Sequence, residues 1–339
     1  MKSILFLFSM VILMATSCKE NKECCAQPTN SPLIQASIGR VGASLDIQTA
    51  TSAGTVLMGG STDVDEAIQW MIRKSGGGDF VVIRATGSTG YNDYIKGLGK
   101  LNSVETLLID SKEKANLEST RNTIMNAEAL FIAGGDQSNY VQFWKDSETS
   151  KAIQYLIDVK KVPIGGTSAG CAILSGYIFD AKNGSVTTEA ALANPFDPQV
   201  SVTKNFIQVP FLQNAIADQH YAQRDRQGRH VVFMARMMKD FDVRAGMGIG
   251  VDEKTAVAIE ETGASTVFGT GNAYFLFADQ LPDQCEPQKK LKWDNSGKAI
   301  KCFIRAGSGK GTDGLHLQEN PPSLPTQFWS VVDGVLKSN

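Results

Sequence analysis

The chain has 339 residues, with 33 Lys and Arg residues against 35 Asp and Glu residues and a formal net charge of −2. This balance excludes the general basic field that attracts nucleic acid, so we expect no nucleic-acid partner. The length is enough for one large domain or two domains of ordinary size.

The first residues have the pattern of an export signal. Lys2 precedes an apolar run over residues 4–14, and small or hydroxyl residues at 15–17 stand directly before Cys18. The run is too short to span a bilayer as a helix. Because the residues before the cysteine resemble a bacterial lipobox, we expect residues 1–18 to be a lipoprotein signal peptide with Cys18 as the lipidated first residue. The alternative is ordinary signal cleavage, in which Cys18 is discarded.

The lipoprotein interpretation has consequences for the place of the protein and for the next segment. It predicts an exported protein that a lipid anchors to a bacterial membrane, in the periplasm or at the cell surface. Residues 19–50 are rich in Lys, Glu, Asn, Gln, Ser and Thr with little periodicity, so we expect a surface tether there.

Strands and helices alternate from residue 51 onward. Apolar runs that end in Gly-rich turns, with amphipathic segments between them, predict strands at residues 55–58, 80–84, 104–109, 129–133 and 162–164. This alternation predicts an α/β fold with a doubly wound, mostly parallel sheet and helices on both faces. The C-terminal half is richer in predicted strands and ends in a predicted helix at 327–336. With no linker after residue 50, we expect one domain over residues 51–339.

A serine stands at the sharpest of these turns. Gly165-Gly-Thr-Ser-Ala-Gly170 follows an apolar strand and precedes a helix-compatible segment, which is the pattern of a nucleophile elbow at Ser168. Glycines suit the cramped turn, and the amide N–H groups that open the helix favour developing negative charge. The alternative is a Gly-rich connection of the kind found in any α/β protein.

A serine nucleophile needs a base, and this chain has only 3 histidines. His230 falls inside a predicted helix among apolar residues, and His316 lies in a late Gly-rich segment. His220 follows an apolar segment and opens a loop before that helix, which is the place of a base at a strand end. We therefore expect His220 to act on Ser168; the alternative is a structural histidine at a helix entry.

The base in turn needs a carboxylate to orient it. Glu189 lies between the serine and the histidine in the chain, and Glu253 follows a second Gly-rich apolar stretch. Spacing does not rank these two carboxylates, and both stay open. Asp218 is too close in sequence to His220 to orient it easily, so we expect Asp218 to bind substrate instead.

Three arginines follow the proposed base: Arg224, Arg226 and Arg229. Guanidinium groups pair bidentately with carboxylates, so this cluster predicts a substrate rich in carboxylates. The alternative is a solvated helix start. Cations at a helix N-terminus oppose its dipole, however, so ordinary stability would not place them there.

The cysteines predict one disulfide and no metal site. Cys285 and Cys302 bracket a polar segment and are expected to pair if the protein is exported, whereas Cys171 is expected to pack as a small apolar group. The state of Cys24 and Cys25 is not readable from the sequence. No pair has the C-x-x-C spacing typical of zinc ligands.

Four stretches together resemble the cyanophycinase family, serine peptidases related to dipeptidase E. They are Gly134-Gly-Asp-Gln137, the Gly165–Gly170 turn, Asp218-Gln-His-Tyr-Ala-Gln-Arg-Asp-Arg-Gln-Gly-Arg229 and Gly248-Ile-Gly-Val-Asp-Glu-Lys-Thr-Ala256. The resemblance implies a flavodoxin-like sheet related to the class I glutamine amidotransferases, and hydrolysis without metal or cofactor. It implies that the substrate is cyanophycin, a poly-aspartate chain with arginine on each side-chain carboxyl, and that the product is β-aspartyl-arginine.

The same resemblance assigns roles to residues of this chain. Ser168 matches the nucleophile and His220 the base, and the oxyanion hole would be the amides of Ala169 and of the Gly135 turn. The positions that match the family's substrate pocket are Gln137, Asp218, Gln219, Arg224, Arg226 and Arg229. The expected protein is thus a secreted, membrane-anchored exopeptidase. The alternatives are a dipeptidase E-like aspartyl or isoaspartyl peptidase and a surface lipoprotein that binds peptides without catalysis; a homodimer also stays open.

Overall fold

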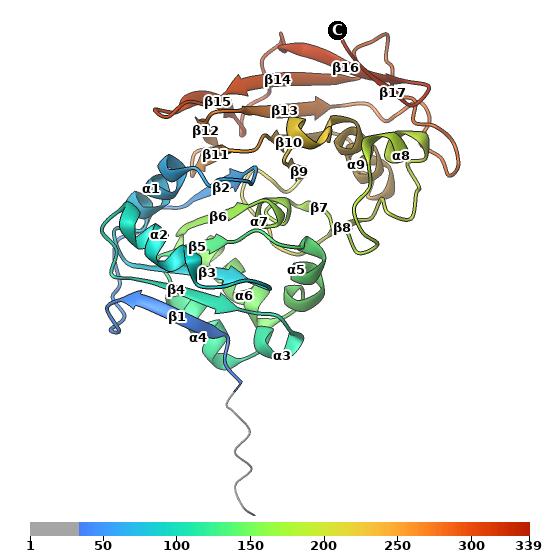
Figure 1. The fold of residues 1–339 in the computed structure, drawn as a ribbon. Helices are drawn as coiled ribbons and strands as arrows, with labels where there is room; N and C mark the ends of the chain where they lie inside the picture. Colours follow the sequence, from blue (N-terminus) through green and yellow to red (C-terminus); the bar gives the residue numbers. More distant parts are fainter. Residues whose placement is uncertain (1–33) are drawn as a thin grey trace, which may run out of the picture. The chain divides into compact units, whose positions relative to one another are not determined.

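Two β-sheets organise the computed structural model, which describes residues 34–339. Within these residues the first sheet has nine strands, in the order β1 (Ser37–Gly42), β4 (Ser103–Leu108), β3 (Asp79–Arg84), β5 (Ala129–Ile132), β6 (Pro163–Thr167), β2 (Gly54–Met58), β11 (Thr255–Glu260), β12 (Ala264–Gly269) and β15 (Thr312–His316). The second has eight, in the order β17 (Val335–Ser338), β16 (Gln327–Val332), β14 (Ile300–Ala306), β13 (Asn272–Ala278), β10 (Gly246–Val251), β9 (Ala215–Gln219), β7 (Tyr177–Phe179) and β8 (Val202–Lys204). Residues 35–339 form one unit, drawn in Figure 1.

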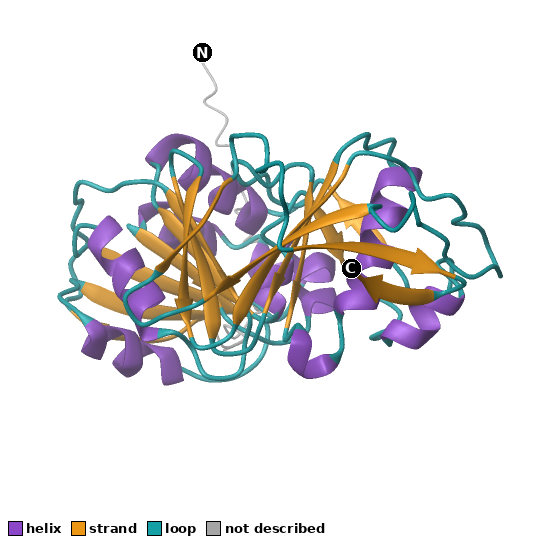
Figure 2. Cartoon of the chain, turned by 90° about the horizontal axis from the view of Figure 1, so that it is seen from above, coloured by secondary structure: helices purple, strands orange, loops and turns teal. Residues whose placement is uncertain are grey.

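The helices cover the parallel centre of the first sheet, in which β4, β3, β5, β6 and β2 run side by side. They are α1 (Asp65–Lys74), α2 (Gly90–Leu98), α3 (Lys112–Ala115), α4 (Glu118–Asn126), α5 (Gln137–Trp144), α6 (Glu148–Tyr155) and α7 (Ala169–Ala172). One core cluster joins α1 and α2 to one face of these strands, and another joins α3 to α7 to the opposite face. Figure 2 shows helices on both sides of the strands, so the predicted α/β fold with two helical layers is confirmed.

The central strands form where the sequence allows burial on both faces of the sheet. Strand β3, Asp-Phe-Val-Val-Ile-Arg, is buried along nearly its whole length, as expected for a central parallel strand. Strand β1 has the opposite pattern, with half-buried and exposed residues in alternation, and pairs antiparallel with β4 at the edge of the sheet. The prediction of a tether over residues 19–50 is therefore wrong for residues 37–42. Because the edge strand buries only one face, its sequence lacks the apolar run that marks the central strands.

The C-terminal half is dominated by antiparallel strands. Helices α8 (Thr188–Ala193) and α9 (Gln227–Asp240) pack on the second sheet, while β10, β13, β14, β16 and β17 extend it. The predicted helix at 327–336 is wrong, since β16 and β17 form a hairpin there with Val332 opposite Val335. The β-branched and aromatic residues of this segment favour a strand. Pairing of β16 with β14 stabilises the strand over a helix.

The cysteines do not pair as predicted. Cys285 and Cys302 are both free thiols, buried in the same apolar cluster of the second sheet, so the predicted disulfide is wrong. Cys302 points into the core from β14, where it behaves as a small apolar residue. Cys171 is also a buried free thiol, as expected. The predicted signal peptide, Cys18, Cys24, Cys25 and residues 19–33 of the tether lie outside the described residues.

Candidate active site

Ser168 occupies the turn between β6 and α7, at the edge where the parallel strands end. Its backbone has φ 53° and ψ −115°, a conformation that non-glycine residues rarely adopt, and its amide donates a hydrogen bond to the Met58 carbonyl at 3.0 Å. Gly170, in α7, lies against the end of β5. A Cβ added to Gly170 would come within 2.1 Å of the Ile132 carbonyl oxygen. The glycine therefore permits the tight strand-to-helix crossing that exposes the serine.

His220 reaches this serine from the other sheet. It follows the last residue of β9, and its amide donates to the Gly59 carbonyl at 2.8 Å, which ties the two strand ends together. Its Nε2 lies 2.8 Å from Ser168 Oγ. Gly60 makes room for the ring, because a Cβ at Gly60 would lie 2.5 Å from His220 Cε1.

Glu253 holds the other side of the imidazole. It lies in the turn after β10, and its Oε1 is 2.6 Å from His220 Nδ1. The hydrogen bond from His220 lowers the pKa of Glu253, so the carboxylate is ionised and accepts the Nδ1 proton, which leaves Nε2 free to accept from Ser168. Asp252 fixes this turn, since its two oxygens accept from the amides of Ala222 and Asn272.

Glu189 does not take part in this arrangement. It is exposed on the first turn of α8, and Glu253 occupies Nδ1 of His220. Of the two carboxylates that the sequence left open, Glu189 is therefore the wrong one and Glu253 orients the histidine. The segment that carries Glu189 packs against α9 rather than at the strand ends, which the linear sequence does not reveal.

The remaining histidines make other contacts. His230 is buried on α9, with Nδ1 2.9 Å from the Tyr221 hydroxyl and Nε2 3.0 Å from the Ile216 carbonyl. His316 ends β15, where its Nδ1 lies 3.8 Å from Glu319. Ser168 thus has His220 as its histidine partner.

Burial lowers the pKa of His220, and Arg224 and Arg226 lower it further, while Glu253 opposes them. The imidazole is consequently neutral at neutral pH, the form that accepts a proton. A neutral imidazole between a hydroxyl and an ionised carboxylate can deprotonate the serine. The carboxylate then stabilises the imidazolium that forms.

A pocket of about 220 Å³ opens beside the serine. Five of the six residues predicted to bind substrate line it, namely Gln137, Gln219, Arg224, Arg226 and Arg229. Gly135, which was predicted for the oxyanion hole, also lines the pocket. The lining residues that were not expected from the sequence are Asp136, Phe179, Ala181, Gly184 and Ser185. Asp136 directly precedes Gln137 in the quoted motif, so that motif was the signal for it, whereas nothing in the sequence pointed to residues 179–185.

Asp218 has a different position from the one expected. It is buried, and Arg229 contacts both of its oxygens, with Nε to Oδ2 at 2.8 Å and Nη2 to Oδ1 at 2.7 Å. Burial alone would raise the pKa of Asp218, but Arg229 and then Arg226 hold it below its usual value. Because this carboxylate is ionised and fully used inside the protein, the expectation that it binds substrate directly is wrong.

The three arginines differ in how much of each remains for a ligand. Arg229 also donates to Ser185 Oγ at 3.0 Å and to the Val186 carbonyl, which anchors the 185–186 loop to β9. Arg226 donates to the Gln219 carbonyl at 2.8 Å, and burial lowers its pKa to about 10. Arg224 is 53% exposed, with Nε 3.7 Å from Glu253. Arg224 therefore has the most hydrogen-bonding capacity to offer a ligand.

Backbone amides also lie close to the serine. Ala169 is the first residue of α7, so its N–H has no partner within the helix. The Gly134–Gly135 turn lies alongside, since a Cβ at Gly134 would be 3.4 Å from Ser168 Cβ. In residues 34–339, His, Cys, Asp and Glu side chains form no group of three or more that could hold a metal ion.

This geometry agrees with comparisons to known proteins. Residues 50–267 match peptidase family S51. The chain belongs to that family. The matched range contains the Ser168 turn, His220 and Glu253.

Curated relatives of this S51 peptidase are named cyanophycinases. The one from Trichormus variabilis is 26% identical over 196 residues, which cover 57% of this chain and 60% of the relative. The one from Synechococcus elongatus is 26% identical over 183 residues, 54% of this chain and 51% of the relative. The chain thus matches about half to three fifths of the length of these relatives. The crystal structure of a peptidase from an acI-B1 Actinobacterium shares the fold, with a TM-score of 0.50 and 14% identity over 79% of this chain and 99% of the other.

Proposed function

We propose that this S51 peptidase removes β-aspartyl-arginine dipeptides from cyanophycin through a triad of Ser168, His220 and Glu253. The observation that carries the proposal is the continuous chain of contacts from Ser168 Oγ to His220 Nε2 at 2.8 Å and from His220 Nδ1 to Glu253 at 2.6 Å. The cyanophycinase names of the curated relatives support the choice of substrate.

In the proposed reaction His220 Nε2 takes the Ser168 proton while Oγ attacks the scissile carbonyl carbon. The amides of Ala169 and Gly135 hold the negative oxygen of the tetrahedral intermediate. The imidazolium then protonates the leaving amine as the carbon–nitrogen bond breaks, which leaves an acyl-enzyme. Water, deprotonated by His220, attacks the ester and regenerates Ser168.

The charges around the pocket support a substrate that carries both signs. Arg224 and the free part of Arg226 would take the free carboxylates of the substrate, which are those of its attached arginines and of the chain end, where Arg forks give bidentate contacts. With Asp218 paired internally, Asp136 is the exposed acid of the pocket and would take the substrate guanidinium.

Incubation of the protein with cyanophycin, followed by mass spectrometry of the products, tests the proposal. We expect β-aspartyl-arginine from the wild type and none from Ser168→Ala, with Ser119→Ala, at an exposed serine of α4 outside the pocket, as a matched control. Faster cleavage of short Asp-X or isoaspartyl peptides than of polymer would instead assign the protein as a dipeptidase E-like enzyme. Binding of these peptides without turnover would make it a peptide-binding protein.

We also make proposals on the fold relatives of this protein and on its location. We expect the sheet to be flavodoxin-like and related to the class I glutamine amidotransferases. We also propose export with Cys18 as the lipid-bearing residue, which supports access to polymer outside the cell. Globomycin-sensitive processing, mass analysis of the mature N-terminus and loss of lipid in Cys18→Ala would test this. Among helices of residues 34–339, none combines the length and hydropathy required to cross a bilayer.

A further inference from the structure

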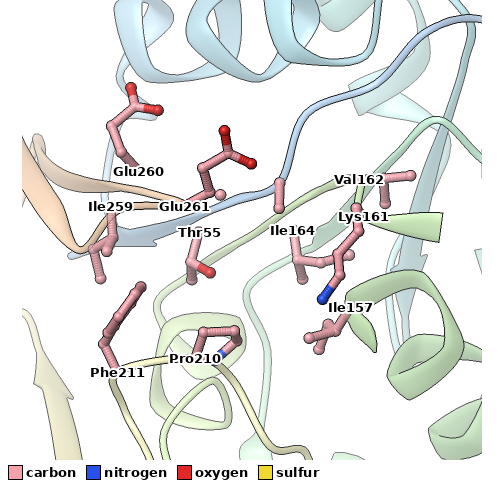
Figure 3. A pocket seen from close by; sticks show the side chains of 12 residues that line it. Thr55, Ile157, Lys161, Val162, Ile164, Pro210, Phe211, Ile259, Glu260 and Glu261 are labelled. Carbon is pink, nitrogen blue, oxygen red and sulfur yellow. The ribbon is translucent and has the colours of Figure 1, made fainter. Parts of the chain in front are cut away.

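A second cavity lies at the opposite edge of the parallel strands from Ser168. Strands β2 and β6 begin at it, with Gly54 and Thr55 on one strand and Ile164 on the other, whereas the same strands end at the triad. Its volume is about 280 Å³, and its lining shares no residue with the pocket beside Ser168. The cavity is therefore a separate site (Figure 3).

The walls of this cavity are mainly aliphatic. Ile157, Val162, Ile164 and Ile259 are buried residues of the core, and Pro210 and Phe211 form the facing wall. The volume lies just below the range of about 300–1,000 Å³ that is typical of sites for drug-sized ligands. The space therefore suits a small molecule with an aliphatic group.

The rim carries charges of both signs. Glu260 is already used, since its oxygens accept from Trp70 Nε1 at 2.9 Å and from Lys74 at 2.6 Å. Lys161 and Glu261 are different: both are exposed at the rim, and within residues 34–339 neither side chain forms an ion pair or a hydrogen bond. Figure 3 shows the Lys161 ammonium turned toward the space between Ile157 and Pro210, with Glu260 and Glu261 across the cavity.

The backbone around the cavity is also unusual. Residues Leu156–Lys160 form a π-helical turn, a feature that is frequent at functional sites. Lys161 (φ 58°) and Phe211 (φ 67°) both have left-handed backbone conformations, and both line the cavity. Lys161 is the left-handed residue that ends the π-helical turn, which is a common way for a helix to end. The backbone therefore holds Lys161 and Phe211 in defined positions on the wall of one small cavity.

We propose that this cavity binds a free aliphatic amino acid as a zwitterion. The ligand carboxylate pairs with Lys161, its ammonium group with Glu261, and its side chain packs on Ile157, Ile164 and Phe211. Each charged group of such a ligand meets an opposite charge with no other partner, and the aliphatic group replaces water at an apolar wall. The site is independent of the triad and of the proposed substrate.

Isothermal titration with L-leucine tests this site. We expect saturable binding at one site to the wild type and equally to Ser168→Ala. Lys161→Met and Glu261→Gln should each weaken binding by about tenfold or more, the effect of one charge-assisted contact. Lys151→Met, at an exposed lysine of α6 outside the cavity, is the matched control and should bind as the wild type does.

Ligand analogues separate the two charged contacts. Leucinamide lacks the carboxylate and 4-methylpentanoate lacks the ammonium group, so both should bind more weakly than L-leucine to the wild type. Circular dichroism melting of each variant checks that the fold is retained. No saturable binding to the wild type, unchanged affinity in both Lys161→Met and Glu261→Gln, or binding that Ser168→Ala abolishes would each overturn the proposal.

Discussion

Glu253 Oε1 and His220 Nδ1 lie 2.6 Å apart, although the two residues are 33 positions apart in the chain. Their contact joins the turn after β10 to the end of β9, two strands that run parallel as neighbours in the second sheet. This sheet supplies the base and its carboxylate, whereas the first sheet supplies Ser168. The triad is thus assembled across the meeting line of the two sheets.

Replacing Glu253 tests which carboxylate orients the base. Glu253→Gln keeps the shape of the side chain but removes the charge that fixes the imidazole tautomer, so we expect kcat to fall by about 10²–10⁴-fold. Glu189→Gln, at the exposed position on α8, should leave kcat unchanged. Steady-state kinetics on the same peptide substrate measures both, and equal losses in the two variants would contradict the assignment.

The pH dependence of activity should follow His220. Burial and the arginines lower its pKa, so the acid limb of kcat/KM should have its midpoint below the usual histidine value of about 6.5. Arg224→Gln removes a positive charge that disfavours the imidazolium, so the pKa should rise and the midpoint should move to higher pH. An unchanged or lower midpoint in Arg224→Gln would argue against this electrostatic coupling.

Gly60→Ala should remove activity through a steric effect. A Cβ there would lie 2.5 Å from the His220 ring and 3.0 Å from Ser168 Cβ, and Gly60 has φ +95°, which disfavours alanine. We expect a large loss of kcat. Gly97→Ala in α2 is the matched control, because nothing lies within 4 Å of that Cβ; it should keep activity and stabilise the helix by about 0.5–1 kcal/mol. Full activity in Gly60→Ala would show that the ring has room to move.

The Asp218–Arg229 pair should matter for stability. Asp218→Ala leaves the Arg229 guanidinium buried without its partner, so we expect the free energy of unfolding to fall by about 3–5 kcal/mol. The double variant Asp218→Leu with Arg229→Met removes both charges and should recover part of this loss. Urea denaturation followed by circular dichroism measures each value. A double variant less stable than Asp218→Ala would contradict a simple buried ion pair.

Cys285 and Cys302 should react as two separate thiols. Because both are free and buried, a thiol reagent should label them only after denaturation, without prior reduction. The melting temperature should also be the same with and without dithiothreitol. Mass spectrometry of peptides from the unreduced protein gives the answer directly, and a linked Cys285–Cys302 peptide would contradict the structure.

Local features of the sequence predicted the alternating strands and helices and two of the three triad members. Buried strands such as β3 are marked by apolar runs, and the Ser168 turn is marked by glycines that the strand-to-helix crossing requires. His220 could be chosen because a strand end and a helix start surround it. These are short-range properties, since the backbone conformation of a few neighbouring residues decides them.

Other features depend on which distant segments meet. The sequence did not distinguish Glu189 from Glu253 as the carboxylate that orients the base. Only the parallel pairing of β9 with β10 brings Glu253 to the histidine. Asp218 looked like a substrate ligand until the fold placed Arg229, eleven residues later along the chain, against both of its oxygens. The hairpin of β16 and β17 and the edge strand β1 likewise form because a neighbouring strand accepts their hydrogen bonds. The sequence by itself therefore determined the α/β alternation, the serine turn and the base, while the tertiary structure decided the carboxylate, the ion pair and the sheet edges, because long-range pairing selects among side chains that look equivalent along the chain.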